Sequence, residues 1–221
     1  EADTAEAMAE SIGRGIIGMT RAFKKIKPDV VLVLGDRVEA LAAAVSAAYS
    51  GLVVGHIHGG DSTQAGLDEY ARHAITKLSH LHFPATKKSA ERIIKMGEDK
   101  KRVFMVGAPG LDSILRQKLI SPAIIAKKYQ LDLEKPIFLV AQHPVTTEVE
   151  EADGQIKETL EALKELAYQV ILIYPNADAG GRRMIKIIKH YKKYNFIRAY
   201  KNLDHLDYLS LMKVADALVG N

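Results

Sequence analysis

Polar side chains that could transfer protons or bind anions follow four short apolar runs of the chain. These segments are Gly35-Asp36-Arg37, His58-Gly59-Gly60-Asp61, Gln142-His143-Pro144 and Tyr174–Gly180, which contains Asn176. Taken singly, an Asp after a strand is most often a helix cap, and a Gly-Gly pair is most often a turn. Their repeated position favours a shared site, because open α/β sheets bind ligands at the carboxyl ends of their strands.

A further group of charged side chains lies in the sequence LDEYARHAITKLSHLHF. Its helical spacing places Asp68 with Arg72, and Glu69 with His73, on shared faces of one helix. One interpretation is a capped helix with a surface ion pair. The other is a carboxylate that acts as an acid or base beside a guanidinium that binds phosphate.

The histidines are unevenly distributed: His56, His58, His73, His80 and His82 are five of the eight in the chain. The spacing of His56, His58 and Asp61 is compatible with a zinc site. However, His56 lies within an apolar run, where a buried, hydrogen-bonded histidine is the more common outcome. No third and fourth ligand follows at a convincing spacing, so we expect neither a metal ion nor a cofactor.

Short apolar runs alternate with segments of helical period along the chain. The runs are Asp29–Leu34, Leu52–Ile57, Leu81–Phe83, Arg102–Val106, Ile137–Ala141, Gln169–Ile173, Phe196–Tyr200 and Ala217–Val219. Continuously apolar strands alternating with helices are typical of parallel sheets that are covered on both faces. The predicted class is therefore α/β.

No strand-like apolar run occurs between Arg116 and Pro136, which predicts a domain boundary in this segment. We expect two Rossmann-like domains, residues 1–118 and 119–221, with the site in the cleft between them. The chain opens within a helical pattern and closes on a strand followed by Gly220-Asn221. We therefore expect a chain truncated at both ends, without the first βα unit of the N-terminal domain and without the end of the C-terminal domain.

Composition excludes several functional classes. The formal net charge is +4, but the basic residues are scattered, and the chain has no Trp and only 6% aromatic residues, so it lacks the stacking platform of a single-strand binder. No apolar run approaches the roughly 18 residues of a membrane span. The absence of cysteine fits a reducing compartment. We expect a cytoplasmic protein with a small anionic substrate and without nucleic-acid or membrane partners.

Six ordered motifs give the chain a family resemblance. They are GDRVEA (Gly35–Ala40), HIHGGD (His56–Asp61), DEYARHAITKLSHLHF (Asp68–Phe83), VGAPGLD (Val106–Asp112), QHPVTTE (Gln142–Glu148) and YPNADAG (Tyr174–Gly180). Together they resemble the UDP-N-acetylglucosamine 2-epimerases, and the RHAITKLSH and QHPVTT strings favour the hydrolysing branch. The resemblance implies a glycosyltransferase-B-like pair of Rossmann-like domains, a UDP-sugar substrate and a homodimer or homotetramer. It also implies that UDP is eliminated to give a glycal, to which water adds, yielding N-acetylmannosamine or a diacetamido analogue.

The resemblance also implies roles for individual residues. Asp36 and Asp68 are acid/base candidates, supported by His58 or Glu69; Arg72 and His143 are candidates for neutralising the leaving diphosphate; Arg37, His73 and Asn176 are expected to position the substrate. One residue departs from the family pattern, because many relatives have glutamate at the position of His58. Three alternatives remain open: a non-hydrolysing epimerase that returns UDP-N-acetylmannosamine, a metal-dependent hydrolase, and a non-catalytic UDP-sugar-binding module.

Overall fold

The computed structural model describes residues 4–63, 66–145 and 147–221. The chain divides into two compact units, Glu1–Leu111 and Asp112–Asn221. The division falls within helix α5 (Pro109–Arg116), whereas the sequence predicted it a few residues later, after residue 118.

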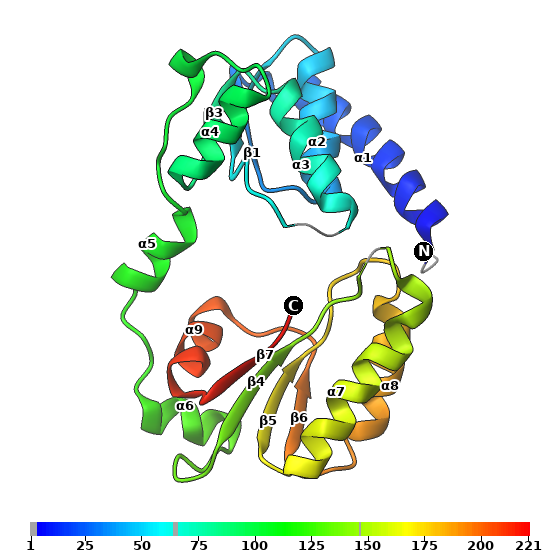
Figure 1. Ribbon diagram of the computed structural model, residues 1–221, viewed down its shortest axis with the longest axis vertical. Coiled ribbons are helices and arrows are strands. Elements are labelled where there is room, and N and C mark those ends of the chain that lie inside the picture. Colours follow the sequence, from blue (N-terminus) through cyan, green and yellow to red (C-terminus); the bar gives the residue numbers. More distant parts are fainter. Residues whose placement is uncertain (1–3, 64–65, 146) are drawn as a thin grey trace. The chain divides into compact units, whose positions relative to one another are not determined.

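The first unit contains a parallel three-stranded sheet in the order β1-β2-β3, of which Figure 1 labels β1 and β3. The strands are β1 (Val30–Leu34), β2 (Val53–Ile57) and β3 (Leu81–Phe83), and the helices are α1 (Ala5–Ile26), α2 (Val38–Tyr49), α3 (Leu67–Leu78) and α4 (Lys87–Lys95). The first turn of α1 is capped by the Thr4 side chain, which accepts a hydrogen bond from the Ala7 N–H. Helix α2 connects β1 to β2 and helix α3 connects β2 to β3, so the carboxyl ends of these strands lie at one edge of the sheet.

Helices cover only one face of β1 among the described residues of the first unit. Val31 and Val33 are buried against Ala44 and Ala47 of α2, with Ile75 of α3 in the same cluster. The alternate residues Val30, Leu32 and Leu34 are 45%, 60% and 60% exposed. The predicted covering of both faces is therefore wrong for β1, because α1, α2 and α3 all contribute to the core on the same face.

The segment Arg102–Val106 does not form the strand that its apolar run predicted. A single turn of 3₁₀-helix, η1 (Lys100–Arg102), ends there, and Val103 makes one isolated bridge to His82. The Phe104 N–H then donates to the His82 carbonyl at 2.8 Å. The Val106 N–H likewise donates to the Pro84 carbonyl at 3.1 Å, but Pro84 has no N–H with which to complete a regular ladder.

The second unit contains a parallel four-stranded sheet in the order β6-β5-β4-β7. The strands are β4 (Ile137–Ala141), β5 (Gln169–Ile173), β6 (Ile197–Tyr200) and β7 (Ala217–Gly220), and the helices are α6 (Pro122–Tyr129), the short η2 (Val149–Glu151), α7 (Ala152–Leu166), α8 (Gly181–Tyr191) and α9 (His205–Val214). The chain builds outward from β4 to β6 and then returns to pair β7 with the other edge of β4. This reversal is a topological switch point, where α/β sheets bind their ligands.

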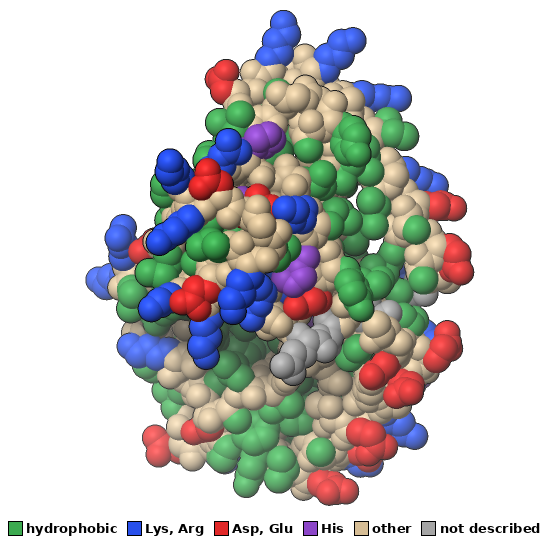
Figure 2. Space-filling model, turned by 45° about the horizontal axis from the view of Figure 1, so that its top comes forward, with side chains coloured by type: hydrophobic (Ala, Val, Ile, Leu, Met, Phe, Trp, Pro, Cys, Tyr) green, Lys and Arg blue, Asp and Glu red, His purple; other side chains and the backbone are tan. Residues whose placement is uncertain are grey.

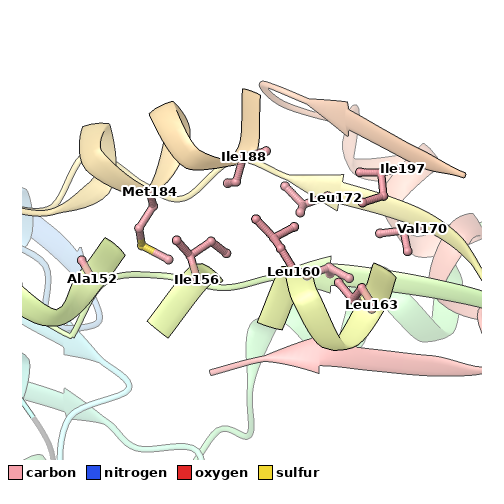
Figure 3. Packing of buried hydrophobic residues seen from close by; sticks show 10 residues of the cluster. Ala152, Ile156, Leu160, Leu163, Val170, Leu172, Met184, Ile188 and Ile197 are labelled. Carbon is pink, nitrogen blue, oxygen red and sulfur yellow. The ribbon is translucent and has the colours of Figure 1, made fainter. Parts of the chain in front are cut away.

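Helices cover both faces of the second sheet. On one face, Ile156 and Leu160 of α7 and Met184 and Ile188 of α8 pack against Leu172 of β5 (Figure 3). On the other face, Ile125 and Tyr129 of α6 and Leu211 of α9 pack against Leu139 and Ile171. The prediction of parallel α/β sheets is confirmed, and the second unit also shows the predicted two-sided cover.

Side chains of both charges lie on the face of the molecule that Figure 2 shows. In Figure 2, Lys and Arg side chains lie among carboxylates and histidines rather than forming one continuous basic field. Within residues 4–63, 66–145 and 147–221, no helix is long and apolar enough to cross a membrane.

Candidate active site

The turn after β1 places Asp36 at the carboxyl edge of the first sheet. Gly35 adopts a positive φ of 74°, and its N–H donates to the Ile57 carbonyl at 3.0 Å. Glycine adopts this conformation without steric cost, so the chain can turn sharply as soon as the strand ends. The Asp36 carboxylate then pairs with the guanidinium of Arg72.

Arg72 of α3 connects three segments of this edge. Its side chain is only 4% exposed, and it pairs with Asp36 through Nη2. Its Nη1 donates to Glu69 Oε2 at 3.0 Å and to the Asp61 carbonyl at 3.2 Å. A buried guanidinium requires such partners, because an unpaired charge is strongly unfavourable away from water. The ion-pair group on α3 is therefore a buried junction rather than the surface pair of the simpler sequence interpretation.

Glu69 holds the turn that follows β2. Its carboxylate accepts from the Thr63 N–H at 2.9 Å and the Ser62 hydroxyl at 3.1 Å, and it pairs with His73 Nε2 at 3.3 Å. The pKa of Glu69 is lowered, chiefly by the backbone hydrogen bond from Thr63. The predicted pair of Glu69 with His73 is thus present, and Glu69 remains an anion that organises the loop.

His58 and Asp61 form a second pair beside this junction. His58 Nδ1 lies 3.1 Å from Asp61 Oδ2, and Asp61 Oδ1 accepts from the Ser89 hydroxyl at 2.6 Å. His58 has a positive φ of 64°, which is uncommon for a residue with a side chain. Asp61 is a site residue that the sequence suggested only through the spacing of a metal site.

His56 is a fully buried structural histidine. Its Nε2 lies 2.8 Å from the Gly35 carbonyl, and its Nδ1 lies 3.1 Å from the Thr76 hydroxyl. Burial lowers the pKa of His56 to about 4, so the ring is neutral at pH 7. A carbonyl only accepts hydrogen bonds, so the neutral ring carries its proton on Nε2, which donates to Gly35.

Both ring nitrogens of His56 contact oxygen atoms of the protein, so neither is available to bind zinc. Among the residues that the structure describes, no group of three or more His, Asp or Glu side chains is arranged to hold a metal ion.

These strand ends surround a pocket of about 410 Å³, within the size range of small-molecule sites. Its lining residues are Leu34, Gly35, Asp36, His58, Asp61, Thr63, Arg72, Pro109 and Gly110. Three predicted site residues, Asp36, His58 and Arg72, are therefore brought together. Asp68, Glu69, Arg37 and His73 are not among the lining residues.

Arg37 and Asp68 lie at helix starts. Arg37 precedes α2 and pairs with Glu39, with Nε 3.4 Å from Oε2. Asp68 is half-buried in the first turn of α3, where a carboxylate interacts favourably with the helix dipole.

His143 and Asn176 lie at the switch point of the second unit. The Asn176 N–H donates to His143 Nδ1 at 3.1 Å, which links the ends of β5 and β4. The His143 N–H donates to Asn221 Oδ1 at 2.8 Å, and Asn221 Nδ2 donates to the His143 carbonyl at 3.2 Å. Asn221, which follows β7, was not predicted to lie beside His143, and Thr146 of the QHPVTTE motif lies outside the described residues.

The hydrogen bond from Asn176 determines the state of the His143 ring. Since Nδ1 accepts a hydrogen bond, it carries no proton, and the neutral ring holds its proton on Nε2. An imidazolium would carry a proton on both nitrogens and lose this bond. The geometry therefore favours a neutral donor at His143 over the protonated imidazole expected from the sequence.

The sequence of this chain is similar to those of two hydrolysing 2-epimerases. Over 215 residues it is 39% identical to a hydrolysing UDP-N,N'-diacetylbacillosamine 2-epimerase of Legionella pneumophila, covering 97% of this chain and 57% of that protein. It is 33% identical to a hydrolysing GDP/UDP-N,N'-diacetylbacillosamine 2-epimerase of Campylobacter jejuni, again covering 97% and 57%. The chain thus spans little more than half the length of these relatives.

The fold matches that of a UDP-GlcNAc 2-epimerase from Neisseria meningitidis bound to UDP-GlcNAc. The TM-score is 0.80 at 20% identity, and the match covers 100% of this chain and 61% of that chain. A UDP-GlcNAc 2-epimerase of Methanocaldococcus jannaschii in complex with UDP-GlcNAc and UDP matches with a TM-score of 0.76 at 19% identity, covering 96% of this chain and 60% of the other. The family model described as UDP-N-acetylglucosamine 2-epimerase matches residues 1–221. The chain belongs to the UDP-N-acetylglucosamine 2-epimerase family.

Proposed function

We propose that this chain contributes to a hydrolysing UDP-sugar 2-epimerase, which converts UDP-N-acetylglucosamine or a diacetamido analogue to the free manno sugar and UDP. The observation that carries the proposal is the pocket that joins Asp36, His58 and the buried Arg72. The hydrolysing relatives from L. pneumophila and C. jejuni support the reaction type, and their names support a diacetamido substrate as the first analogue to test.

The chemistry requires a base and an acid at carbon 2 of the sugar. The proton on this carbon is not adjacent to a carbonyl, so it becomes acidic only as the bond between carbon 1 and the phosphate oxygen breaks. The base takes this proton, the electrons of the carbon–hydrogen bond form the double bond of a glycal, and UDP leaves with the electrons of the broken bond. Water then adds its hydroxyl group to carbon 1, and a proton is returned to the opposite face of carbon 2.

Asp36 and His58 are our candidates for these proton transfers, because both line the pocket. The role we assign to Arg72 is to support Asp36. The Arg72 guanidinium is buried and bonded to Asp36, Glu69 and the Asp61 carbonyl. It therefore balances and orients a carboxylate instead of binding the diphosphate directly. Asp68 retains its predicted role as an alternative acid or base, tested by Asp68→Asn.

The second unit supplies the candidate diphosphate-binding groups. His143 and Asn176 lie at the switch point, where neutral donors and backbone N–H groups are expected to bind the phosphates of UDP. Removing UDP-binding groups should weaken UDP itself, whereas removing proton-transfer groups should not. We also propose a cytoplasmic location, which the absence of cysteine fits.

The test is incubation of the full-length protein with UDP-N-acetylglucosamine and, separately, its diacetamido analogue, with products followed by ¹H and ³¹P NMR. We expect free UDP and a free manno sugar in equal amounts, unaffected by a chelator. UDP-N-acetylmannosamine as the product would instead support a non-hydrolysing epimerase. Binding without turnover of either sugar would support a binding module.

A further inference from the structure

We propose that Asp61 is a positioning residue that fixes the His58 imidazole in one tautomer, with the proton on Nδ1 and the basic lone pair on Nε2. This inference deepens the proposed function and rests on it for the catalytic role of His58. The tautomer itself is a property of the resting protein and can be measured without turnover.

The hydrogen bonds of Asp61 define the tautomer. Asp61 Oδ2 lies 3.1 Å from His58 Nδ1, and an ionised carboxylate only accepts hydrogen bonds. The contact therefore requires a proton on Nδ1, which leaves Nε2 as the acceptor of the neutral ring. An aspartate that holds a histidine in this way also stabilises the imidazolium that forms when Nε2 takes a proton.

Helix α4 holds Asp61 in place. The Ser89 hydroxyl donates to Asp61 Oδ1 at 2.6 Å, and Ser89 is only 3% exposed. The Ser89 proton is used in this bond, so its contact at 2.7 Å with the Thr86 hydroxyl is one in which Thr86 donates. Both oxygens of the Asp61 carboxylate are thereby engaged, and its orientation toward His58 is set from the first turn of α4.

The backbone of the turn is also held in an unusual conformation. His58 adopts the left-handed region, which is sterically unfavourable for a residue other than glycine. The Arg92 side chain binds the Gly60 carbonyl, and Arg72 binds the Asp61 carbonyl at 3.2 Å. A Cβ on Gly60 would lie 2.3 Å from the Ser89 carbonyl oxygen, so only glycine permits this close approach. Strain maintained by several neighbours is typical of functional sites.

His58 is better suited to transfer a proton than the other titratable groups around it. His56 is bonded through both ring nitrogens, and Glu69 is bound by Thr63, Ser62 and Arg72. In the proposed reaction, one of His58 and Asp36 removes the proton from carbon 2 and the other returns a proton to the opposite face. When His58 removes it, Nε2 gains the proton and the imidazolium pairs with Asp61.

The first experiment measures the tautomer directly. Long-range ¹H–¹⁵N correlation spectra of the full-length protein at pH 8 should show a protonated Nδ1 and an unprotonated Nε2 for His58, assigned by the loss of its signals in His58→Gln. Asp61→Asn should change this pattern, whereas Asp99→Asn, an exposed aspartate in the same unit, should not. A His58 ring with its proton on Nε2 would overturn the inference, whatever the protein catalyses.

The second experiment separates positioning from folding. Asp61→Asn should lower kcat by about 10²- to 10⁴-fold, change the pH profile of kcat, and leave KM within about threefold of wild type. Ser89→Ala removes one bond to Asp61 and should lower kcat by a smaller factor, which keeps the test available if Asp61→Asn does not fold. A folded Asp61→Asn variant with wild-type kcat and pH profile would overturn the role of Asp61.

Discussion

The side chains at the strand ends have different kinds of bonding partners in the two units. At the ends of β1 and β2, charged groups pair with charged or titratable groups: Arg72 with Asp36 and Glu69, and His58 with Asp61. At the ends of β4, β5 and β7, side chains bond mainly to the backbone, as His143 does with the Asn176 N–H and Asn221 with both backbone polar groups of His143. A carboxylate also takes part in these bonds, since Asp178 accepts from the Asn176 side chain at 2.6 Å.

The difference separates two kinds of chemistry. Paired charges around a pocket stabilise groups that gain or lose protons during a reaction. Side chains fixed by backbone bonds keep a constant hydrogen-bonding pattern, which suits recognition of a bound nucleotide. We therefore expect substitutions in the first unit to affect turnover and those in the second unit to affect UDP binding.

Asp36→Asn should have the largest effect on turnover. The amide retains the shape of the carboxylate but cannot transfer the proton, so UDP release should slow by about 10²- to 10⁴-fold. The control is Asp132→Asn, an exposed aspartate of the second unit whose side chain is bonded to the Glu134 N–H. Wild-type UDP release in a folded Asp36→Asn protein would remove Asp36 from the mechanism.

Arg72→Met should strongly destabilise the first unit. The side chain is 4% exposed and pairs with two carboxylates, so its loss should lower the free energy of unfolding by about 3 kcal/mol, the lower end for a broken buried pair. Arg183→Met is the matched control, because Arg183 also pairs with two carboxylates but is 34% exposed. Equal losses in urea titrations of the two variants would show that burial at Arg72 is not the deciding factor.

His56 should make the first unit sensitive to acid. Its folded pKa is about 4, below the ordinary value of 6.5 for histidine, so the unfolded chain binds this proton more readily between those values. Stability should therefore fall as pH decreases from about 6.5 to 4, by on the order of 3 kcal/mol from this group.

Urea titrations at pH 7 and pH 4.5 test this dependence. The difference in unfolding free energy between the two pH values should shrink in His56→Gln. It should persist in His205→Gln, whose exposed imidazole lies at the start of α9. An unchanged difference in His56→Gln would mean that other groups carry the acid sensitivity.

Asn221→Ala should have the smallest effect on stability and on UDP binding. It removes two hydrogen bonds to the backbone of His143, but the residue is exposed, so water can replace them. We expect a loss of at most about 1 kcal/mol in unfolding free energy and at most a roughly threefold loss of UDP affinity, with Asn202→Ala as the exposed control. A tenfold or larger loss would mean that Asn221 contacts UDP itself.

The sequence predicted the class of fold and three pocket residues because these depend on local patterns. Strand-end positions identify Asp36 and His58, and helical spacing places Arg72 near them. The burial of Arg72 was not predictable, since the same spacing also occurs in surface ion pairs. Asp61 and Asn221 act through partners 28 and 78 positions away in the chain, and no short motif carries that information.

Calorimetric titration of UDP into Asp36→Asn and His143→Ala tests the division of labour between the units most directly. We expect Asp36→Asn to bind UDP within about twofold of wild type. His143→Ala should bind roughly 2- to 13-fold more weakly, as expected for the loss of a neutral hydrogen bond of about 0.5–1.5 kcal/mol. Weaker UDP binding by Asp36→Asn together with unchanged binding by His143→Ala would contradict this division of labour.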